Sequence, residues 1–129
     1  MSNPYQKYKT ASVKSASKEK LLLMLYEGAI KFMKKAIIAI DKNDIAERGE
    51  NISRAFDIVL ELMNTLDHKV GGDIASNLEQ LYMFITDELT AANLNNDKAR
   101  LENALKIMTT LYDGWKDAIE QLKKSDKRP

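Results

Sequence analysis

The stretch LENALKIMTTLYDGWKDAIEQL, residues 101–122, decides the fold class. Its large apolar side chains recur alternately four and three residues apart, at Leu101, Leu105, Met108, Tyr112, Trp115, Ile119 and Leu122. Side chains spaced in this way lie along one face of an α-helix, with a repeat of about 3.5 residues that is typical of helices packed in bundles. The stretch therefore predicts a bundle-facing helix over residues 97–124, followed by a frayed tail at 125–129.

Three further stretches with helical spacing of apolar residues precede this helix, at about residues 18–41, 44–66 and 73–94. Ser17 and Asp44 suit the N-cap position of the first two, and Gly71 and Gly72 predict a loop before the third. Prolines occur only at positions 4 and 129, so none interrupts a helix between them. Short loops between four helices predict an all-α fold, an antiparallel four-helix bundle over residues 17–124 with a short N-terminal arm at 1–16.

The length and composition indicate one domain and exclude several kinds of function. A chain of 129 residues fits a single domain, and its net charge of +1 gives no field that favours nucleic acid. The absence of cysteine excludes disulfides and thiolate metal sites. No apolar run approaches the roughly 18 residues of a membrane span, and the first residues do not resemble a signal peptide. We therefore expect a cytoplasmic protein without membrane insertion.

Residues suited to catalysis are nearly absent from the sequence. His68 is the single histidine and precedes the Gly-Gly pair, where it is expected to be a solvated loop residue. The carboxylates are spread along polar helix faces, and no phosphate-binding loop or nucleophile–base arrangement is present. A bundle enzyme or phosphorelay centred on His68 is the alternative, but we expect no enzyme, no metal and no cofactor.

The first two predicted helices carry more apolar surface than a bundle helix needs. The apolar arc of the first spans roughly 200° and that of the second is also wide, whereas a core-facing stripe is nearer 100° wide. The residues at the edges of these arcs are Leu21, Leu23, Ile30, Ile58 and Leu60. Three interpretations stay open: a homodimer face, a groove for an amphipathic segment of a partner, and a generous core whose flanks the N-terminal arm covers.

Two glycines and two tyrosines bear on the same question. Gly28 and Gly114 lie inside predicted helices, where glycine costs about 1 kcal/mol relative to alanine, and both sit at the edge of an apolar arc. Glycine there permits close approach of a neighbouring helix or of a docked peptide. Tyr5 and Tyr8 are three residues apart in the arm, and their rings are suited to a reversible contact with an apolar groove.

Several segments follow one another in a distinctive order: NPYQKY (3–8), LLLMLYEGAI (21–30), ISRA (52–55), ELMNTLD (61–67) and GGDIASNL (71–78), with Trp115 in the last helix. Taken together and in order, they resemble the FliS family of flagellar secretion chaperones. The resemblance covers nearly the whole chain. It implies a cytoplasmic chaperone that binds the C-terminal segment of flagellin, prevents premature polymerisation and delivers flagellin to the flagellar type III export apparatus.

The resemblance and the apolar pattern together give a set of candidate residues for a flagellin-binding groove or arm. The candidates are Tyr5, Tyr8, Leu21, Leu23, Gly28, Ile30, Ile58, Leu60, Asn77, Tyr82 and Asn93. Tyr5 and Tyr8 match the family as arm anchors, whereas Asn77, Tyr82 and Asn93 match family positions whose role, binding or bundle stability, stays open. A component of the flagellar export gate and a second copy of the unliganded chain are further partners left open.

Overall fold

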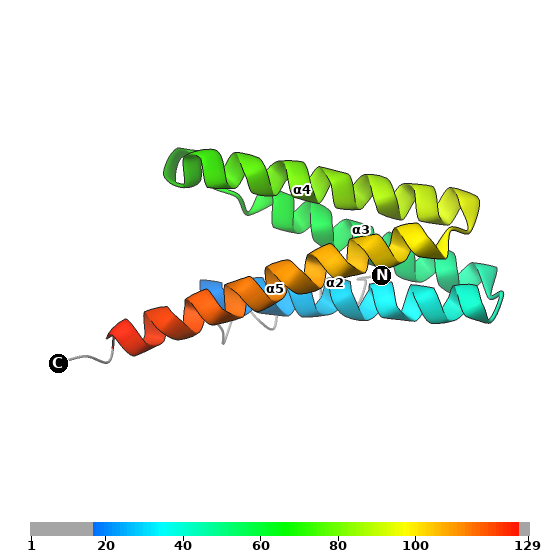
Figure 1. Ribbon diagram of the computed structural model, residues 1–129, viewed down its shortest axis with the longest axis horizontal. Coiled ribbons are helices and arrows are strands. Elements are labelled where there is room, and N and C mark those ends of the chain that lie inside the picture. The colour runs from blue at the N-terminus through cyan, green and yellow to red at the C-terminus, as the bar shows by residue number, and fades with distance from the viewer. Residues whose placement is uncertain (1–16, 127–129) are drawn as a thin grey trace, which may run out of the picture.

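The computed structural model describes residues 17–126 and forms four consecutive α-helices in that part of the chain (Figure 1). They are α2 (Lys18–Asp41), α3 (Ile45–Asn64), α4 (His68–Asn95) and α5 (Lys98–Asp126). Successive helices run in opposite directions, and no strand occurs among the described residues. The predicted all-α, antiparallel four-helix bundle is confirmed, whereas the predicted arm at residues 1–16 lies outside the described residues.

Polar side chains cap the first turns of α2 and α3. Ser17 Oγ accepts a hydrogen bond from the backbone N–H of Lys20 at 3.2 Å. The Asp44 carboxylate accepts one from the backbone N–H of Glu47 at 3.1 Å. Each bond satisfies a backbone donor that has no partner within the first turn of a helix, so these residues stabilise the starts of both helices.

The start of α4 differs from the sequence prediction. The helix begins at His68, and not at the predicted residue 73, because the Asp67 carboxylate accepts two backbone N–H hydrogen bonds, at 3.0 and 3.1 Å, and so caps it there. Gly72 has φ 51° and ψ −121° and bends the chain after the first turn. The glycines therefore form a kink inside the helix instead of a loop in front of it.

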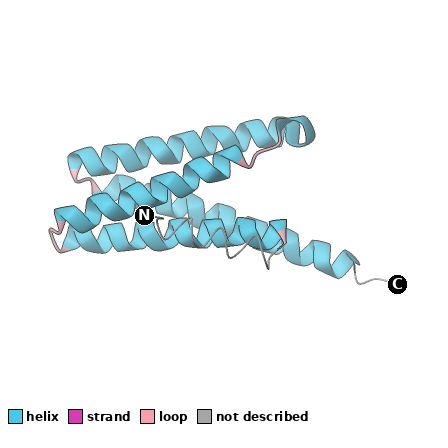
Figure 2. Ribbon diagram, turned by 180° about the vertical axis from the view of Figure 1, so that it is seen from behind, coloured by secondary structure: helices cyan, strands magenta, loops and turns pink. Residues whose placement is uncertain are grey.

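The four helices surround one core, with each helix packed against two others. α2 contacts α3 and α5, and α4 contacts the same two helices. In Figure 1, α5 leaves the end of α4 and runs towards the start of α2, so that α4 and α5 diverge along the molecule. Figure 2 shows the same divergence from behind. The bundle therefore spreads apart at the end where α2 and α4 begin.

Large and small side chains alternate in the core. The largest fully buried side chains are Tyr26, Met33, Val59, Leu62, Tyr82, Ile85, Leu89, Leu101 and Met108. Buried alanines, among them Ala29, Ala36 and Ala55, lie between them and let the helix backbones approach closely. Such interlocking of large and small residues gives the close packing that makes a core intolerant of lost volume.

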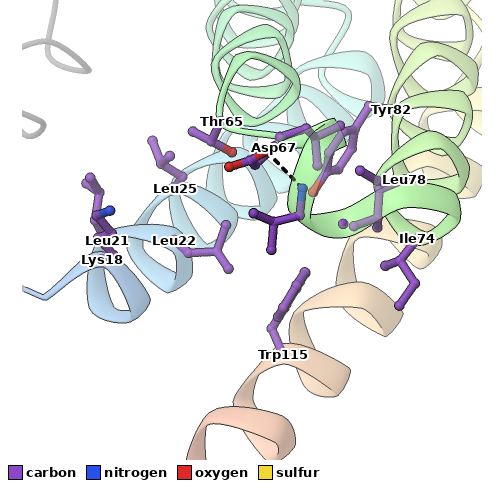
Figure 3. A pocket seen from close by; sticks show the side chains of 14 residues that line it. Lys18, Leu21, Leu22, Leu25, Thr65, Asp67, Ile74, Leu78, Tyr82 and Trp115 are labelled. Atoms are coloured by element: carbon purple, nitrogen blue, oxygen red, sulfur yellow. Dashed lines mark hydrogen bonds between the residues drawn. The ribbon is translucent and has the colours of Figure 1, made fainter.

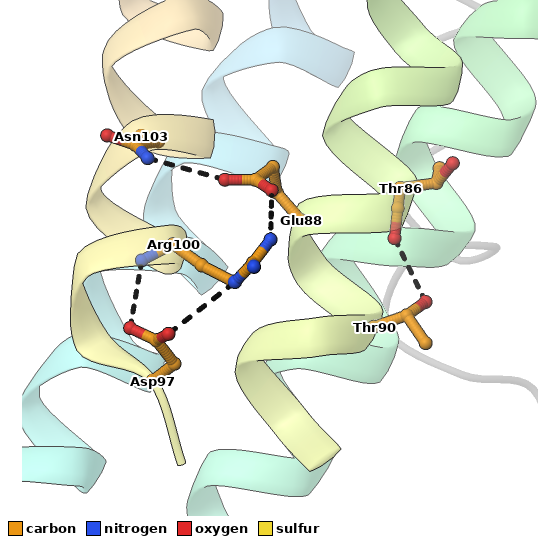
Figure 4. A network of polar contacts seen from close by, with 6 residues as sticks. All are labelled: Thr86, Glu88, Thr90, Asp97, Arg100 and Asn103. Carbon is orange, nitrogen blue, oxygen red and sulfur yellow. Dashed lines mark hydrogen bonds and ion pairs between the residues drawn. The ribbon is translucent and has the colours of Figure 1, made fainter. Parts of the chain in front are cut away.

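A polar network closes the opposite end of the bundle, beside the turn that joins α4 and α5 (Figure 4). Glu88 of α4 is only 6% exposed, and its carboxylate lies 2.9 Å from Arg100 Nη1 and accepts a hydrogen bond from Asn103 at 3.3 Å. Arg100 also lies 3.5 Å from the Asp97 carboxylate. One end of the bundle is therefore held by charged and polar contacts, while the other is open.

Candidate functional site

An apolar pocket, here called the end pocket, lies at the open end of the bundle (Figure 3). Its volume is about 540 Å³, within the range of sites that bind small molecules or clusters of side chains. The lining residues come from the start of α2, the α3–α4 connection, the start of α4 and one position of α5. They are Lys18, Leu21, Leu22, Leu25, Thr65, Leu66, Asp67, Val70, Gly71, Ile74, Ala75, Leu78, Tyr82 and Trp115.

The bend at Gly72 shapes one wall of this pocket. Val70 precedes the bend and Ile74 follows it, and both side chains line the pocket. Val70 is 86% exposed and Ile74 is 69% exposed. Burial of apolar side chains is favourable by about 25 cal/mol for each Å² removed from solvent, and these two side chains do not gain that free energy while they are exposed. Neighbouring exposed apolar residues beside a pocket are typical of a surface that binds another molecule.

Two residues that line the end pocket, Trp115 and Tyr82, are joined through the buried hydroxyl of Tyr26, and these three hydrogen-bonding groups are here called the polar floor. Trp115 Nε1 donates to the Tyr26 hydroxyl at 3.1 Å, and the Tyr26 hydroxyl is hydrogen-bonded to the Tyr82 hydroxyl. The two tyrosine rings are tilted at 51° with centroids 6.4 Å apart. Burial raises the pKa of both hydroxyls, so both remain protonated at neutral pH.

A second, shallower pocket with a volume of about 380 Å³, here called the side groove, lies between α2 and α5. Ile30 and Ile38 give it apolar surface, and lysines surround them; the lining residues are Glu27, Ile30, Lys31, Lys34, Lys35, Ile38 and Tyr112. The Tyr112 hydroxyl donates to the Glu27 carboxylate at 2.5 Å, and this hydrogen bond raises the pKa of Tyr112 to about 12. The contact joins α5 to α2.

The structure brings only a few of the predicted site residues to these two surfaces. Leu21 and Tyr82 line the end pocket. Ile30 lines the side groove. Leu23, Leu60 and Asn77 are partly or fully exposed but line neither surface. The candidates therefore do not form one continuous site among the described residues.

Two of the predicted groove residues contact each other inside the bundle instead. A Cβ atom built on Gly28 would lie 3.2 Å from Ile58 Cδ1, and Ile58 is only 2% exposed. The reason is that α2 and α3 approach closely where glycine has no side chain. Ile58 is thus a core residue, and the partner element at Gly28 is a neighbouring helix.

Of the remaining candidates, Asn93 lies away from both surfaces. Asn93 accepts a hydrogen bond from Arg48 Nε at 3.3 Å and so links α4 to α3 near the closed end. Tyr5 and Tyr8 lie outside the described residues. The position of Asn93 fits a residue that stabilises the bundle.

Of the residues that α4 and α5 contribute to the end pocket, Tyr82 alone is among the sequence-predicted candidates. The sequence prediction places Val70 in the loop before the third helix, and Ile74 and Leu78 within that helix. A signal was present, because Val70, Ile74 and Leu78 recur four residues apart on both sides of the Gly-Gly pair. That spacing continues one apolar face through the bend.

The described residues hold little that would support catalysis. No group of three potential metal-binding side chains occurs among them. His68 is exposed at the start of α4, with Nε2 3.3 Å from the Glu79 carboxylate. Within residues 17–126, no helix is long and apolar enough to span a bilayer.

The fold and the end pocket define the class of the protein: an α-helical bundle with an apolar pocket at one end. The family model described as flagellar protein FliS matches residues 1–122. The flagellar secretion chaperone FliS of Vibrio cholerae is 36% identical over 89% of this chain and 88% of its own length. That of Bacillus subtilis is 34% identical over 95% of this chain and 90% of its own length. The chain therefore belongs to the FliS family, a family of flagellar secretion chaperones and not of enzymes.

Proposed function

We propose that this protein binds the C-terminal segment of flagellin in the bacterial cytoplasm, prevents its premature polymerisation and delivers it to the flagellar type III export apparatus. Membership of a family of flagellar secretion chaperones supports a flagellar protein as the partner. The single observation that carries the binding role is the end pocket with Val70 and Ile74 exposed at its edge. A component of the export gate is the proposed receiver of the complex.

A disordered segment needs a large apolar contact in order to bind. Ordering each residue costs on the order of 1–2 kcal/mol of backbone entropy, which burial of apolar side chains must offset. The end pocket and the side groove both include residues of α2 and α5. A segment that wraps around this pair of helices contacts both surfaces, and this favours a long, wrapped partner over a single short helix.

Calorimetry with a synthetic flagellin C-terminal peptide tests the proposal. Ile74→Asp places a charge at the edge of the end pocket, where binding would have to remove it from water, and we expect affinity to fall by about tenfold or more. Because Ile74 is already largely exposed in the free protein, the variant should keep its unfolding midpoint.

Leu94→Asp is the matched control, because Leu94 lies on the same helix, is 80% exposed and lines neither surface. Its affinity should equal that of the unmodified protein. Equal losses in both variants, or no binding by the unmodified protein, would contradict the proposal. Ile30→Asp then measures separately how much the side groove contributes.

A homodimer is the competing use of the exposed apolar surface. Size-exclusion chromatography with light scattering distinguishes the two, since a stable dimer that does not bind the peptide would favour self-association. A flagellin polymerisation assay tests the second part of the proposal. Addition of the protein should delay filament growth, and Ile74→Asp should restore it.

A further inference from the structure

The three groups of the polar floor carry three donor hydrogens but make only two hydrogen bonds with one another. The indole N–H of Trp115 can only donate, so the oxygen of Tyr26 accepts in that bond. The contact between Tyr26 and Tyr82 uses one of the two hydroxyl hydrogens. No described residue accepts a hydrogen bond from the other hydroxyl hydrogen.

The position of the two tyrosines decides which one carries this hydrogen. Both tyrosines are fully buried, but Tyr26 does not line the pocket, so a free hydrogen on Tyr26 would be out of reach of any bound molecule and would cost about 1–3 kcal/mol. Tyr82 does line the pocket, and Figure 3 shows it reaching from α4 towards the space above Trp115. The favourable arrangement is therefore a chain in which Trp115 donates to Tyr26 and Tyr26 donates to Tyr82.

From this arrangement we infer that Tyr82 donates a hydrogen bond to a main-chain carbonyl oxygen of the bound flagellin segment. The inference rests on the proposed function, which it deepens by naming a specificity-determining residue. Carbonyls at the end of a helix or in an extended segment have no partner of their own, and an apolar pocket offers them none. A donor at the floor selects the position of the segment that presents such a carbonyl. Each bond in the chain polarises the next and strengthens the last.

Substitutions that remove a single hydroxyl group separate this hydrogen bond from packing. Tyr82→Phe keeps the ring and removes the hydroxyl, so affinity for the flagellin C-terminal peptide should fall by about tenfold, the equivalent of one net hydrogen bond. Thr90→Val is the control, because the Thr90 hydroxyl is also on α4, donates to the Thr86 carbonyl oxygen and lines neither surface. Its affinity should be within about twofold of that of the unmodified protein. Urea unfolding of each variant shows whether the fold is intact.

Peptides in which single amides are replaced by esters then locate the acceptor. An ester carbonyl is a weaker acceptor than an amide, so at one position the ester should weaken binding to the unmodified protein but not to Tyr82→Phe. Trp115 is the single tryptophan, so its emission reports occupation of the pocket by a tryptophan-free peptide.

Three outcomes are distinguishable. Coupling at one peptide position supports the inference. Equal affinity of Tyr82→Phe and the unmodified protein, or coupling at no position, overturns it while the proposed function stands. Failure of the unmodified protein to bind the peptide overturns the proposed function and the inference with it.

Discussion

An alanine at residue 72 would be strained by its backbone conformation, although its side chain would contact no neighbouring atom. Gly72 has φ 51° and ψ −121°, a conformation essentially confined to glycine, and no atom lies within 4 Å of a Cβ built there. The residue lets α4 bend between Val70 and Ile74, so the open side of the end pocket depends on it. Glycine at this position is required by the backbone alone.

Alanine at two glycines should therefore change stability in opposite directions. Gly72→Ala should lower the free energy of unfolding by about 1–3 kcal/mol, because alanine is strained at that φ. Gly114→Ala should raise it by up to about 1 kcal/mol, since Gly114 lies within α5, where a Cβ meets no atom within 4 Å. Urea unfolding measures both changes. A neutral Gly72→Ala variant would show that the bend is not held in this conformation.

Gly28 shows what the sequence can and cannot predict about one residue. Its place at the edge of an apolar arc predicted close approach of another element, and the structure places Ile58 Cδ1 3.2 Å from the built Cβ. The sequence left open whether that element was a bundle helix or a docked peptide. Periodicity identifies the face of a helix, but it does not identify the neighbour that covers that face.

At the scale of elements, α4 and α5 are held together by one buried carboxylate. Glu88 pairs with Arg100 at 2.9 Å, and its side chain is largely removed from water, whereas about half of the Arg100 side chain is exposed. Removal of the cation leaves a buried negative charge with Asn103 as its remaining partner on α5. Such a charge costs more than the net gain from the intact pair.

Arg100→Ala should therefore lower the free energy of unfolding by about 2 kcal/mol. The additional change Glu88→Gln should recover part of this loss, because it removes the unpaired charge, and a double-mutant cycle measures the coupling. Arg54→Ala is the control: Arg54 pairs with Glu50 on the exposed surface of α3 and contacts the Phe32 ring, contacts worth about 1 kcal/mol at most. Equal losses in the two single variants would mean that Glu88 is well solvated.

The regular repeat of residues 101–122 predicted α5 but not its full environment. Leu101, Ala104 and Met108 are buried as the pattern predicts. Trp115 is partly buried and lines the end pocket, and Leu122 is exposed. The same repeat thus continues past the point where α5 diverges from α4, because the spacing of apolar residues carries no information on the length of the helix that faces them.

For the whole molecule, the number of helices followed from the sequence, whereas the pocket did not. Four apolar stripes and their caps are local features, and each depends on residues a few positions apart. The end pocket depends on the divergence of α4 and α5 and on the bend at Gly72. Both arise from packing between distant segments, so only Leu21 and Tyr82 among the candidates line the end pocket.

The open end also depends on contacts that hold α5 against α2 rather than α4. Tyr112 donates to Glu27, and Trp115 donates to Tyr26 one turn further along α5. The first contact loses its donor hydrogen when Tyr112 ionises, whereas the second keeps the indole N–H of Trp115 as its donor. Alkaline pH therefore weakens the contact between Tyr112 and Glu27 by removing its donor hydrogen.

Tyr112 should make stability depend on pH above its ordinary pKa of 10.0, since the hydrogen bond to Glu27 raises the folded-state pKa to about 12. Below pH 10 both states are protonated and the contribution is complete. Between these two pKa values the unfolded state loses the proton first, so stability falls as pH rises, until the contribution is lost above about pH 12.

The test compares the unmodified protein with Tyr112→Phe, because Tyr26 and Tyr82 also have pKa values raised by burial and act in the same direction in both proteins. Urea unfolding between about pH 9 and pH 11 should show a steeper loss for the unmodified protein than for this variant. Near-ultraviolet titration should likewise lose one late tyrosinate step in the variant, and identical pH profiles for the two proteins would show that Tyr112 does not hold α5 to α2.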